Sequence, residues 1–415
     1  MMRARLLLAA AAAASAQTWT RHTLADPAAL CIDGSPGVYY VRPGDPSRVY
    51  LFQQAGGWAM SPQDLLARSR TPLGSTRADP PATSAFAIED VLTGNATRNP
   101  HFAAWTSVYL RYCDGASRAS DAAAPLVVNG TQLWARGFPI LRASLDALLA
   151  PGGALAGAAS VIVGGGSAGG LGVLLHADYV AARVRAVQPR AAVLAVAADG
   201  FFGDLASVWG GRRFAAEMFA RVAGMGNVSR EGVGAACWDA HGGAAAPCLF
   251  AAAALAHSAT PTFVLNSFQD EYQAGTFLAP SPASLDAPGG LAEDAAFAPC
   301  TRAPARGCNA TQYAQWRGMG AALLGAMRSA IAPPHGGFLH SCPTHGTCIQ
   351  GRCTAVRLAG AAGVGETGMG ALGRWLAGAG AGAAQPLVLA VDEEWPAAGA
   401  WPNVRAPNAL CPAPY

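Results

Sequence analysis

The amino-acid sequence predicts an α/β fold, with a mostly parallel central sheet and helices on both of its faces. The first observation behind this prediction is that short apolar runs alternate with longer Ala- and Leu-rich stretches of helical length. Such alternation is typical of β-α-β units, whose strands pair in parallel. The second is that runs such as residues 161–163, Val-Ile-Val, are apolar throughout, which suits a strand covered on both sides.

The elements can be placed in order along the chain. We expect strands at residues 49–53, 107–112, 159–163, 192–197, 262–266 and 386–391, and helices at 139–150, 170–187, 212–222 and 311–331. Residues 274–300 mix Pro, Ala, Gly and Ser, and we expect an irregular loop that Cys300 and Cys308 hold in place. Residues 359–385 are rich in Ala and Gly, and we assign them neither helix nor strand. Because no repeat or linker is visible, residues 17–415 are expected to form one domain with loop insertions.

Composition narrows the class of protein. The chain has 415 residues, of which 52% are hydrophobic and 13% charged, so it can bury a core of ordinary size. All 28 basic residues are Arg, the formal net charge is only +3, and no four Arg cluster together. Since a nucleic-acid-binding protein concentrates its basic residues on one face, nucleic acid is not an expected partner.

The first residues have the pattern of a signal peptide, which we assign to residues 1–16. Arg3 and Arg5 precede an apolar stretch at 6–14, and Ala14-Ser15-Ala16 matches a cleavage site. The apolar stretch is shorter than the roughly 20 residues that span a bilayer, so no integral membrane segment is expected in the mature chain. We therefore expect a secreted protein, located outside the cell or in a cell wall.

Cysteine usage and glycosylation motifs agree with export. The ten cysteines, an even number, suggest disulfides. Four Asn-x-Ser/Thr motifs begin at Asn95, Asn129, Asn227 and Asn309. No paired C-x₂-C motif occurs, so a structural zinc site is not expected.

The strongest chemical signal lies at residues 165–169, Gly-Gly-Ser-Ala-Gly, which match the Gly-x-Ser-x-Gly nucleophile elbow of α/β hydrolases. The motif alone is weak evidence in a chain with 50 glycines. Its context strengthens it, because a predicted strand precedes Ser167 and a predicted helix follows. The sharp turn requires small flanking residues, and N–H groups at a helix start can stabilise an oxyanion.

A serine nucleophile needs a base and an acid that orients the base. In α/β hydrolases these follow the serine in the order acid, then histidine. Asp270 and Glu271 both follow the predicted strand at 262–266, at the carboxyl end where such sheets carry their chemistry. Three histidines come later: His335, His340 and His345. Chain order leaves both acids and all three histidines open.

Several segments together carry a family resemblance. They are residues 31–40 (CIDGSPGVYY), the Gly-Gly-Trp loop at 56–58, 99–105 (NPHFAAW), 111–117 (RYCDGAS), 166–171 (GSAGGL), 266–273 (NSFQDEYQ) and 341–345 (SCPTH). In this order they resemble the pectin acetylesterases and their animal relative Notum, a secreted carboxylesterase. The resemblance covers most of the chain, from about residue 28 to 348.

The resemblance implies three catalytic residues and three oxyanion-hole backbone amides. The catalytic residues would be Ser167 as nucleophile, Asp270 as orienting acid and His345 as general base. The amides would be those of Gly57, Trp58 and Ala168. It also implies a Cys31–Cys113 disulfide, and a mechanism without a metal or organic cofactor.

The chain departs from the family pattern at four positions. Ala59 and approximately Leu65 stand where the family usually has two cysteines, which suits the loss of one disulfide. Gly166 replaces a cysteine before the nucleophile, and His340 replaces an asparagine near the base. The last departure bears on substrate contacts more than on the three catalytic residues.

The expected function is therefore that of a secreted serine esterase with an acyl-enzyme intermediate. The resemblance implies an O-acetylated polysaccharide such as pectin as substrate. The main alternative is the removal of longer acyl chains from lipid or protein, as in the Notum branch. A secreted binding protein without activity is a further alternative, which the intact serine, acid and histidine disfavour. The oligomeric state stays open.

Overall fold

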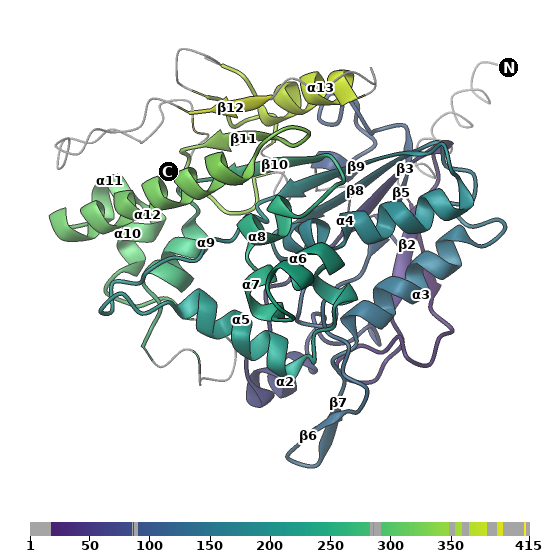
Figure 1. The fold of residues 1–415 in the computed structure, drawn as a ribbon, viewed down its shortest axis with the longest axis horizontal. Coiled ribbons are helices and arrows are strands. Elements are labelled where there is room, and N and C mark those ends of the chain that lie inside the picture. Colours follow the sequence, from purple (N-terminus) through teal and green to yellow (C-terminus); the bar gives the residue numbers. More distant parts are fainter. Residues whose placement is uncertain are drawn as a thin grey trace, which may run out of the picture.

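A ten-stranded sheet runs through this computed structural model, with helices packed around it (Figure 1). The structure describes residues 18–84, 86, 90–282, 285, 292–347, 353–358, 365–379, 388–392 and 411. The predicted signal peptide at 1–16 lies outside these residues.

The strand order is β12-β11-β10-β9-β8-β3-β5-β2-β1-β4. The bounds are β1 Trp19–Thr23, β2 Val38–Arg42, β3 Asp45–Gln53, β4 Ala82–Thr83, β5 Trp105–Leu110, β8 Ser160–Gly166, β9 Ala192–Ala198, β10 Thr262–Ser267, β11 Gly336–His340 and β12 Leu389–Val391. All pairs from β5 through β3 and β8 to β12 are parallel, whereas β2, β1 and β4 are antiparallel. The predicted mostly parallel sheet is confirmed.

The sequence predicted the centre of the sheet better than its edges. The first five predicted strands correspond to β3, β5, β8, β9 and β10, and the last overlaps β12, although residues 386–387 lie outside the described part. The antiparallel edge and β11 were not predicted. β11 reads Gly-Gly-Phe-Leu-His and has weak strand propensity of its own, so its pairing with β10 and β12 decides its conformation. A separate hairpin of β6 (Leu126–Val128) and β7 (Thr131–Leu133) was also missed.

The four predicted helices are present as α3, α4, α5 and α12, each shifted by at most three residues at either end. The helix bounds are α2 Pro62–Arg68, α3 Gly137–Leu149, α4 Ala168–Val187, α5 Phe214–Met225, α6 Ala235–Ala240, α7 Ala245–Cys248, α8 Ala251–Ala256, α9 Glu271–Gln273, α10 Ala298–Arg302, α11 Pro304–Gly307, α12 Ala310–Ala330 and α13 Gly368–Ala379. The described part also contains two short 3₁₀ helices, η2 Asp90–Leu92 and η3 Glu231–Val233, and a π-helix, η4 Ala274–Leu278. Helix α13 lies within the tract that the sequence left unassigned.

The sheet separates two apolar cores, because successive side chains of a strand point to opposite faces. In β3, Val49 and Leu51 pack in the core that also holds α3, α4 and α12. Tyr50 and Phe52 pack on the other face, in the core that holds Trp375 of α13. Helices therefore cover both faces of the sheet, as Figure 1 shows for α4 and α13.

Two of the disulfides with both cysteines in the described part join segments that are distant in sequence, and two close short loops. Cys31–Cys113 is present, which confirms the pairing that the family resemblance implied. The others are Cys237–Cys248, Cys300–Cys308 and Cys342–Cys411, and Cys353 is disulfide-bonded as well. Ala59 and Leu65, which replace two family cysteines, are both buried in one small apolar cluster, so packing occupies the place of the lost bond.

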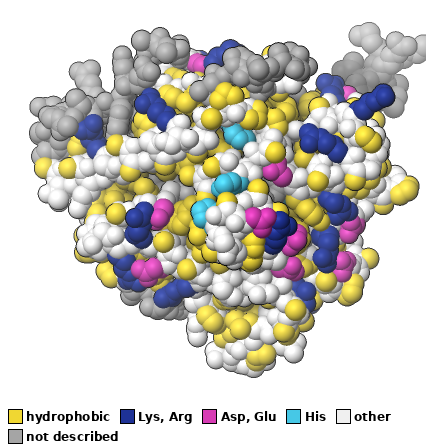
Figure 2. All heavy atoms as spheres, viewed as in Figure 1, with side chains coloured by type: hydrophobic (Ala, Val, Ile, Leu, Met, Phe, Trp, Pro, Cys, Tyr) yellow, Lys and Arg dark blue, Asp and Glu magenta, His cyan; other side chains and the backbone are white. Residues whose placement is uncertain are grey.

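Positively and negatively charged side chains are interspersed on the surface. On the face in Figure 2, arginine side chains are scattered and several lie beside acidic ones. Arg212 pairs with Glu217 at 2.6 Å, for example, and Arg213 with Asp204 at 2.8 Å. In the described part of the chain, none of the helices combines the length and the apolar character needed to cross a membrane.

Candidate active site

The predicted strand–serine–helix turn is present at the carboxyl edge of the parallel sheet. β8 ends at Gly166 and α4 begins at Ala168, with Ser167 between them at φ 54°. A positive φ is strained for a residue with a side chain, and such strain recurs at functional sites. The N–H of Ser167 donates to the carbonyl of Ala198 at the end of β9, which holds the serine in this conformation.

Two glycines allow the turn to pack against its surroundings. A Cβ atom on Gly169 would lie 2.1 Å from the carbonyl oxygen of Gln53 at the end of β3. One on Gly165 would lie 2.3 Å from the carbonyl oxygen of Gly169. Neither distance is compatible with a side chain, so both glycines of the Gly-x-Ser-x-Gly motif are required by close backbone approach.

His345 and Asp270 meet Ser167 from the loops after β11 and β10. The Nε2 atom of His345 lies 2.7 Å from Oγ of Ser167, and its Nδ1 lies 2.8 Å from Oδ2 of Asp270. Asp270 is fully buried, and its other oxygen accepts a hydrogen bond from the N–H of Gln273. This chain of contacts can move a proton from the serine hydroxyl to the histidine and hold the resulting positive charge.

The structure separates the alternatives that chain order left open. Asp270 contacts the ring of His345, whereas Glu271 accepts from the backbone N–H of His345 at 3.3 Å. His340 instead contacts the hydroxyl of Thr347, and the ring of His335 accepts from a backbone N–H at the start of β10. Both acids therefore hold His345, one by its ring and one by its backbone.

Sequence reasoning missed a second buried carboxylate, that of Asp199. Burial raises the pKa of Asp199 to about 7. The charge of His345 acts to lower this pKa, and the charge of Asp270 acts to raise it. Burial alone would lower the pKa of His345, but Asp270, together with Asp199 and Glu271, raises it to about 9. Asp199 directly follows β9, which the sequence predicts as a strand. Its position at the carboxyl end of a parallel strand could therefore have marked it as a candidate for the same edge of the sheet.

The Gly-Gly-Trp loop lies beside the elbow. Gly57 has φ 64° and Trp58 is buried. The guanidinium of Arg68, in α2, donates to the carbonyl oxygens of Gly56 and Trp58 at 2.6 and 3.2 Å. Among the described residues, none accepts a hydrogen bond from the backbone N–H groups of Gly57, Trp58 or Ala168. These three amides are the ones assigned to the oxyanion hole from the sequence.

A cavity of about 430 Å³ opens beside His345. Most of its lining residues are polar or charged, and they are Glu271, Tyr272, Gly275, Thr276, Glu293, Thr301, Arg302 and His345. The ring of Tyr272 stacks on that of His345 with centroids 5.0 Å apart. The ring of Phe202 lies 6.0 Å from that of His345, between centroids, and packs edge-to-face against the indole of Trp58 at 4.7 Å.

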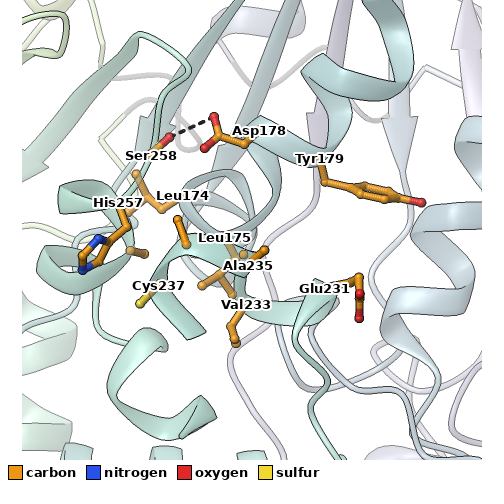
Figure 3. A pocket seen from close by; sticks show the side chains of 13 residues that line it. Leu174, Leu175, Asp178, Tyr179, Glu231, Val233, Ala235, Cys237, His257 and Ser258 are labelled. Atoms are coloured by element: carbon orange, nitrogen blue, oxygen red, sulfur yellow. Dashed lines mark hydrogen bonds between the residues drawn. The ribbon is translucent and has the colours of Figure 1, made fainter. Parts of the chain in front are cut away.

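A second cavity, of about 300 Å³, lies between α4, α6 and α8 (Figure 3). Asp178 points at Ser258 there, and its carboxylate also accepts hydrogen bonds from Thr260. None of the residues around Ser167 and His345 lines this cavity. Close by, Cys237, His241 and Cys248 lie within metal-ligand distance, but the two cysteines form a disulfide and offer no free thiolate.

The fold and the site together define an α/β hydrolase: a parallel sheet with a serine elbow at its carboxyl edge, faced by a histidine and a buried carboxylate. The chain belongs to the pectinacetylesterase family, whose sequence model matches residues 11–399. Its relatives are esterases, and the chain is a carboxylic-ester hydrolase.

Individual relatives agree with this assignment. Pectin acetylesterase 5 of Arabidopsis thaliana is 31% identical over 327 residues, which cover 76% of this chain and 70% of the relative. Palmitoleoyl-protein carboxylesterase notum1' of Xenopus laevis is 32% identical over 163 residues, or 39% of this chain and 32% of the relative. The solved structure of the Wnt deacylase Notum from Drosophila has the same fold, with a TM-score of 0.72 at 19% identity, and the match covers 95% of this chain and all of that one.

Proposed function

We propose that the protein is a secreted serine esterase that removes O-acetyl groups from a polysaccharide, with Ser167 as nucleophile, His345 as general base and Asp270 as orienting acid. The observation that carries the proposal is the contact chain from Ser167 Oγ to His345, 2.7 Å, and from His345 to Asp270, 2.8 Å. It occurs in a chain whose family consists of pectin acetylesterases and their relatives.

In this mechanism, Ser167 Oγ attacks the ester carbonyl carbon while its proton passes to Nε2 of His345. The N–H groups of Gly57, Trp58 and Ala168 donate to the oxyanion of the tetrahedral intermediate. The intermediate collapses as His345 returns the proton to the departing sugar oxygen. Water then attacks the acyl-enzyme, gives its proton to His345, and acetate leaves as Ser167 regains its hydrogen.

The lining of the cavity beside His345 supports a sugar as the alcohol part of the substrate. Glu271 and Glu293 have carboxylate oxygens that can accept hydrogen bonds from sugar hydroxyls, and the guanidinium of Arg302 adds N–H donors. The stacked Tyr272 supplies an aromatic wall. A hydrocarbon chain would cover these polar side chains without offering them hydrogen bonds, which is unfavourable.

A longer acyl group is the competing proposal, since the chain also resembles palmitoleoyl-protein carboxylesterases. Phe202, Phe277 and Trp58 form a buried aromatic cluster near His345, which an acyl chain could contact. Rates with p-nitrophenyl acetate and p-nitrophenyl octanoate separate the two proposals. We expect faster hydrolysis of the acetate; a strong preference for the octanoate would overturn the acetylesterase assignment.

The substrate itself is tested by acetate release from a panel of acetylated polysaccharides, including pectin. Ser167→Ala is the inactive control. Ser144→Ala is the matched control for the loss of a buried hydroxyl, because Ser144 donates to a backbone carbonyl within α3. We expect acetate release from at least one polymer by the wild type and Ser144→Ala, and none by Ser167→Ala. Equal activity of Ser167→Ala and the wild type would disprove the mechanism.

Export, with residues 1–16 as signal peptide and 17–415 as a single esterase domain, is part of the proposal. The disulfides support it, as does the exposure of Asn95, Asn129, Asn227 and Asn309. Thiol titration of the denatured, non-reduced protein should find few free cysteines. Eight or more free thiols would contradict export.

A further inference from the structure

Ser117 is a fully buried serine whose hydroxyl is not used in the mechanism above. It ends the segment 111–117 that follows β5, and its backbone has φ 52°. Its N–H donates to the phenol oxygen of Tyr112 at 3.0 Å, and that phenol donates to the carbonyl oxygen of Gly57. The backbone of Ser117 is therefore tied to the Gly-Gly-Trp loop.

The hydroxyl of Ser117 connects both sides of the proposed oxyanion hole. It accepts a hydrogen bond from the indole Nε1 of Trp58 at 2.8 Å. It donates its own hydrogen to the carbonyl oxygen of Ala168 at 2.7 Å. Trp58 and Ala168 are on different segments, one on the loop after β3 and one at the start of α4, and both are buried.

We propose that Ser117 is a positioning residue, whose hydroxyl holds the Trp58 loop and the start of α4 at the spacing that the oxyanion requires. The inference rests on the proposed function, since it presupposes that the amides of Gly57, Trp58 and Ala168 bind the oxyanion. Oxyanion donors must lie about 2.7–3.1 Å from the place where charge develops, so a small change in their separation weakens the interaction. Ser117 touches neither substrate nor the reacting atoms.

The hydroxyl is suited to this task because it is both donor and acceptor. The indole N–H donates and the carbonyl oxygen accepts, and the Ser117 hydroxyl bonds to both groups at once. Replacement by Ala removes the acceptor of the Trp58 indole N–H and the hydroxyl that donates to the Ala168 carbonyl oxygen. Both groups are buried, so water does not readily replace the lost partner. The loop can then relax away from the elbow.

The test compares Ser117→Ala with wild type in p-nitrophenyl acetate hydrolysis, with rates expressed per active site titrated. Complete loss of one oxyanion donor costs about 10²–10³ in kcat. Because Ser117 acts through position only, we expect kcat to fall roughly tenfold with KM nearly unchanged. The inhibition constant of phenylboronic acid, which forms a tetrahedral adduct on a serine, should rise by a similar factor. A purely structural role would lower the melting temperature without changing either value per active site.

Two further variants keep the inference testable. Ser144→Ala removes a buried hydroxyl bonded to a backbone carbonyl in α3, and should keep wild-type kcat and boronate inhibition. Trp58→Phe breaks the same bridge from its other end, so it serves if Ser117→Ala does not fold. The double variant should lose little more activity than either single variant, because both remove one bridge.

The outcomes separate this inference from the proposed function. If Ser167→Ala is inactive while Ser117→Ala and Trp58→Phe both keep wild-type kcat and boronate affinity, the positioning role is wrong and the mechanism stands. If Ser167→Ala keeps wild-type activity, the mechanism itself is wrong. Fully additive effects of Ser117→Ala and Trp58→Phe would also overturn the bridge.

Discussion

The two sides of the site are held in place by different means. The elbow around Ser167 is fixed by backbone packing, with Gly165 and Gly169 so close to neighbouring carbonyls that no side chain fits. The loop at 56–58 is fixed by hydrogen bonds to side chains from α2 and from the segment after β5. Arg68 and Tyr112 donate to its carbonyl oxygens, and Ser117 accepts from the Trp58 indole.

This difference has a consequence for how each side responds to mutation. Backbone packing tolerates no added atom, so a side chain added at Gly165 or Gly169 should affect folding and activity together. A loop held by side chains can lose one bond and still fold, so changes there should affect activity more than stability. The variants below test this contrast.

The largest effect is expected from Ser167→Ala. Without the nucleophile, kcat should fall by at least about a thousandfold, as in other serine hydrolases that lose a member of the triad. The backbone of residue 167 keeps its positive φ in the alanine variant, so the melting temperature should stay close to that of the wild type. Circular dichroism and thermal unfolding check that the variant is folded, so that the fall in kcat reflects the missing nucleophile.

Gly169→Ala tests backbone packing at the elbow. The new Cβ would lie 2.1 Å from the Gln53 carbonyl oxygen, so we expect a loss of about 1–3 kcal/mol in the free energy of unfolding and a loss of activity. Urea unfolding and kcat measure the two. Gly318→Ala, at an exposed position of α12 where a Cβ meets nothing within 4 Å, is the matched control and should stabilise slightly. Wild-type stability of Gly169→Ala would contradict the packing argument.

Arg68→Met tests the loop side. It removes two hydrogen bonds to the carbonyls of Gly56 and Trp58 while keeping much of the side-chain volume. We expect kcat to fall about tenfold, equivalent to about 1.4 kcal/mol in the barrier, with little change in melting temperature. Arg70→Met removes an exposed guanidinium two residues away and should leave kcat unchanged. If both variants behave alike, the loop does not depend on Arg68.

Asp199→Asn is expected to shift a pH profile rather than abolish activity. The neutral form of His345 accepts the proton, so kcat/KM should rise with pH as His345 loses its proton, near its pKa of about 9. Asp199 helps to raise that pKa, so its replacement by Asn should lower it and move the acidic limb to lower pH. Asp204→Asn, at an exposed carboxylate paired with Arg213, is the control and should leave the profile in place. A wild-type profile in Asp199→Asn would show that this carboxylate does not act on His345.

The sequence predicted the parallel centre of the sheet, the long helices and the elbow. Each of these has a local signature: an apolar run such as Val161–Ile162–Val163, an Ala/Leu-rich stretch of helical length, or glycines around a serine. It did not predict β11 or the antiparallel edge, because short strands with little propensity of their own take their conformation from neighbours. It also missed Asp199 and gave Ser117 no role, since burial and partners are not visible in a run of residues.

By itself, the sequence determined the types of residue for the chemistry and their order along the chain. Chain order left two acids and three histidines, and the family resemblance selected Asp270 and His345. Only the tertiary structure decided the distances: it brings His345 to 2.7 Å from Ser167 across 178 residues. The reason is physical. A strand, a helix or a tight turn depends on the sterics of a few neighbouring residues, whereas the meeting of side chains that follow β8, β10 and β11 depends on the order and register of the whole sheet.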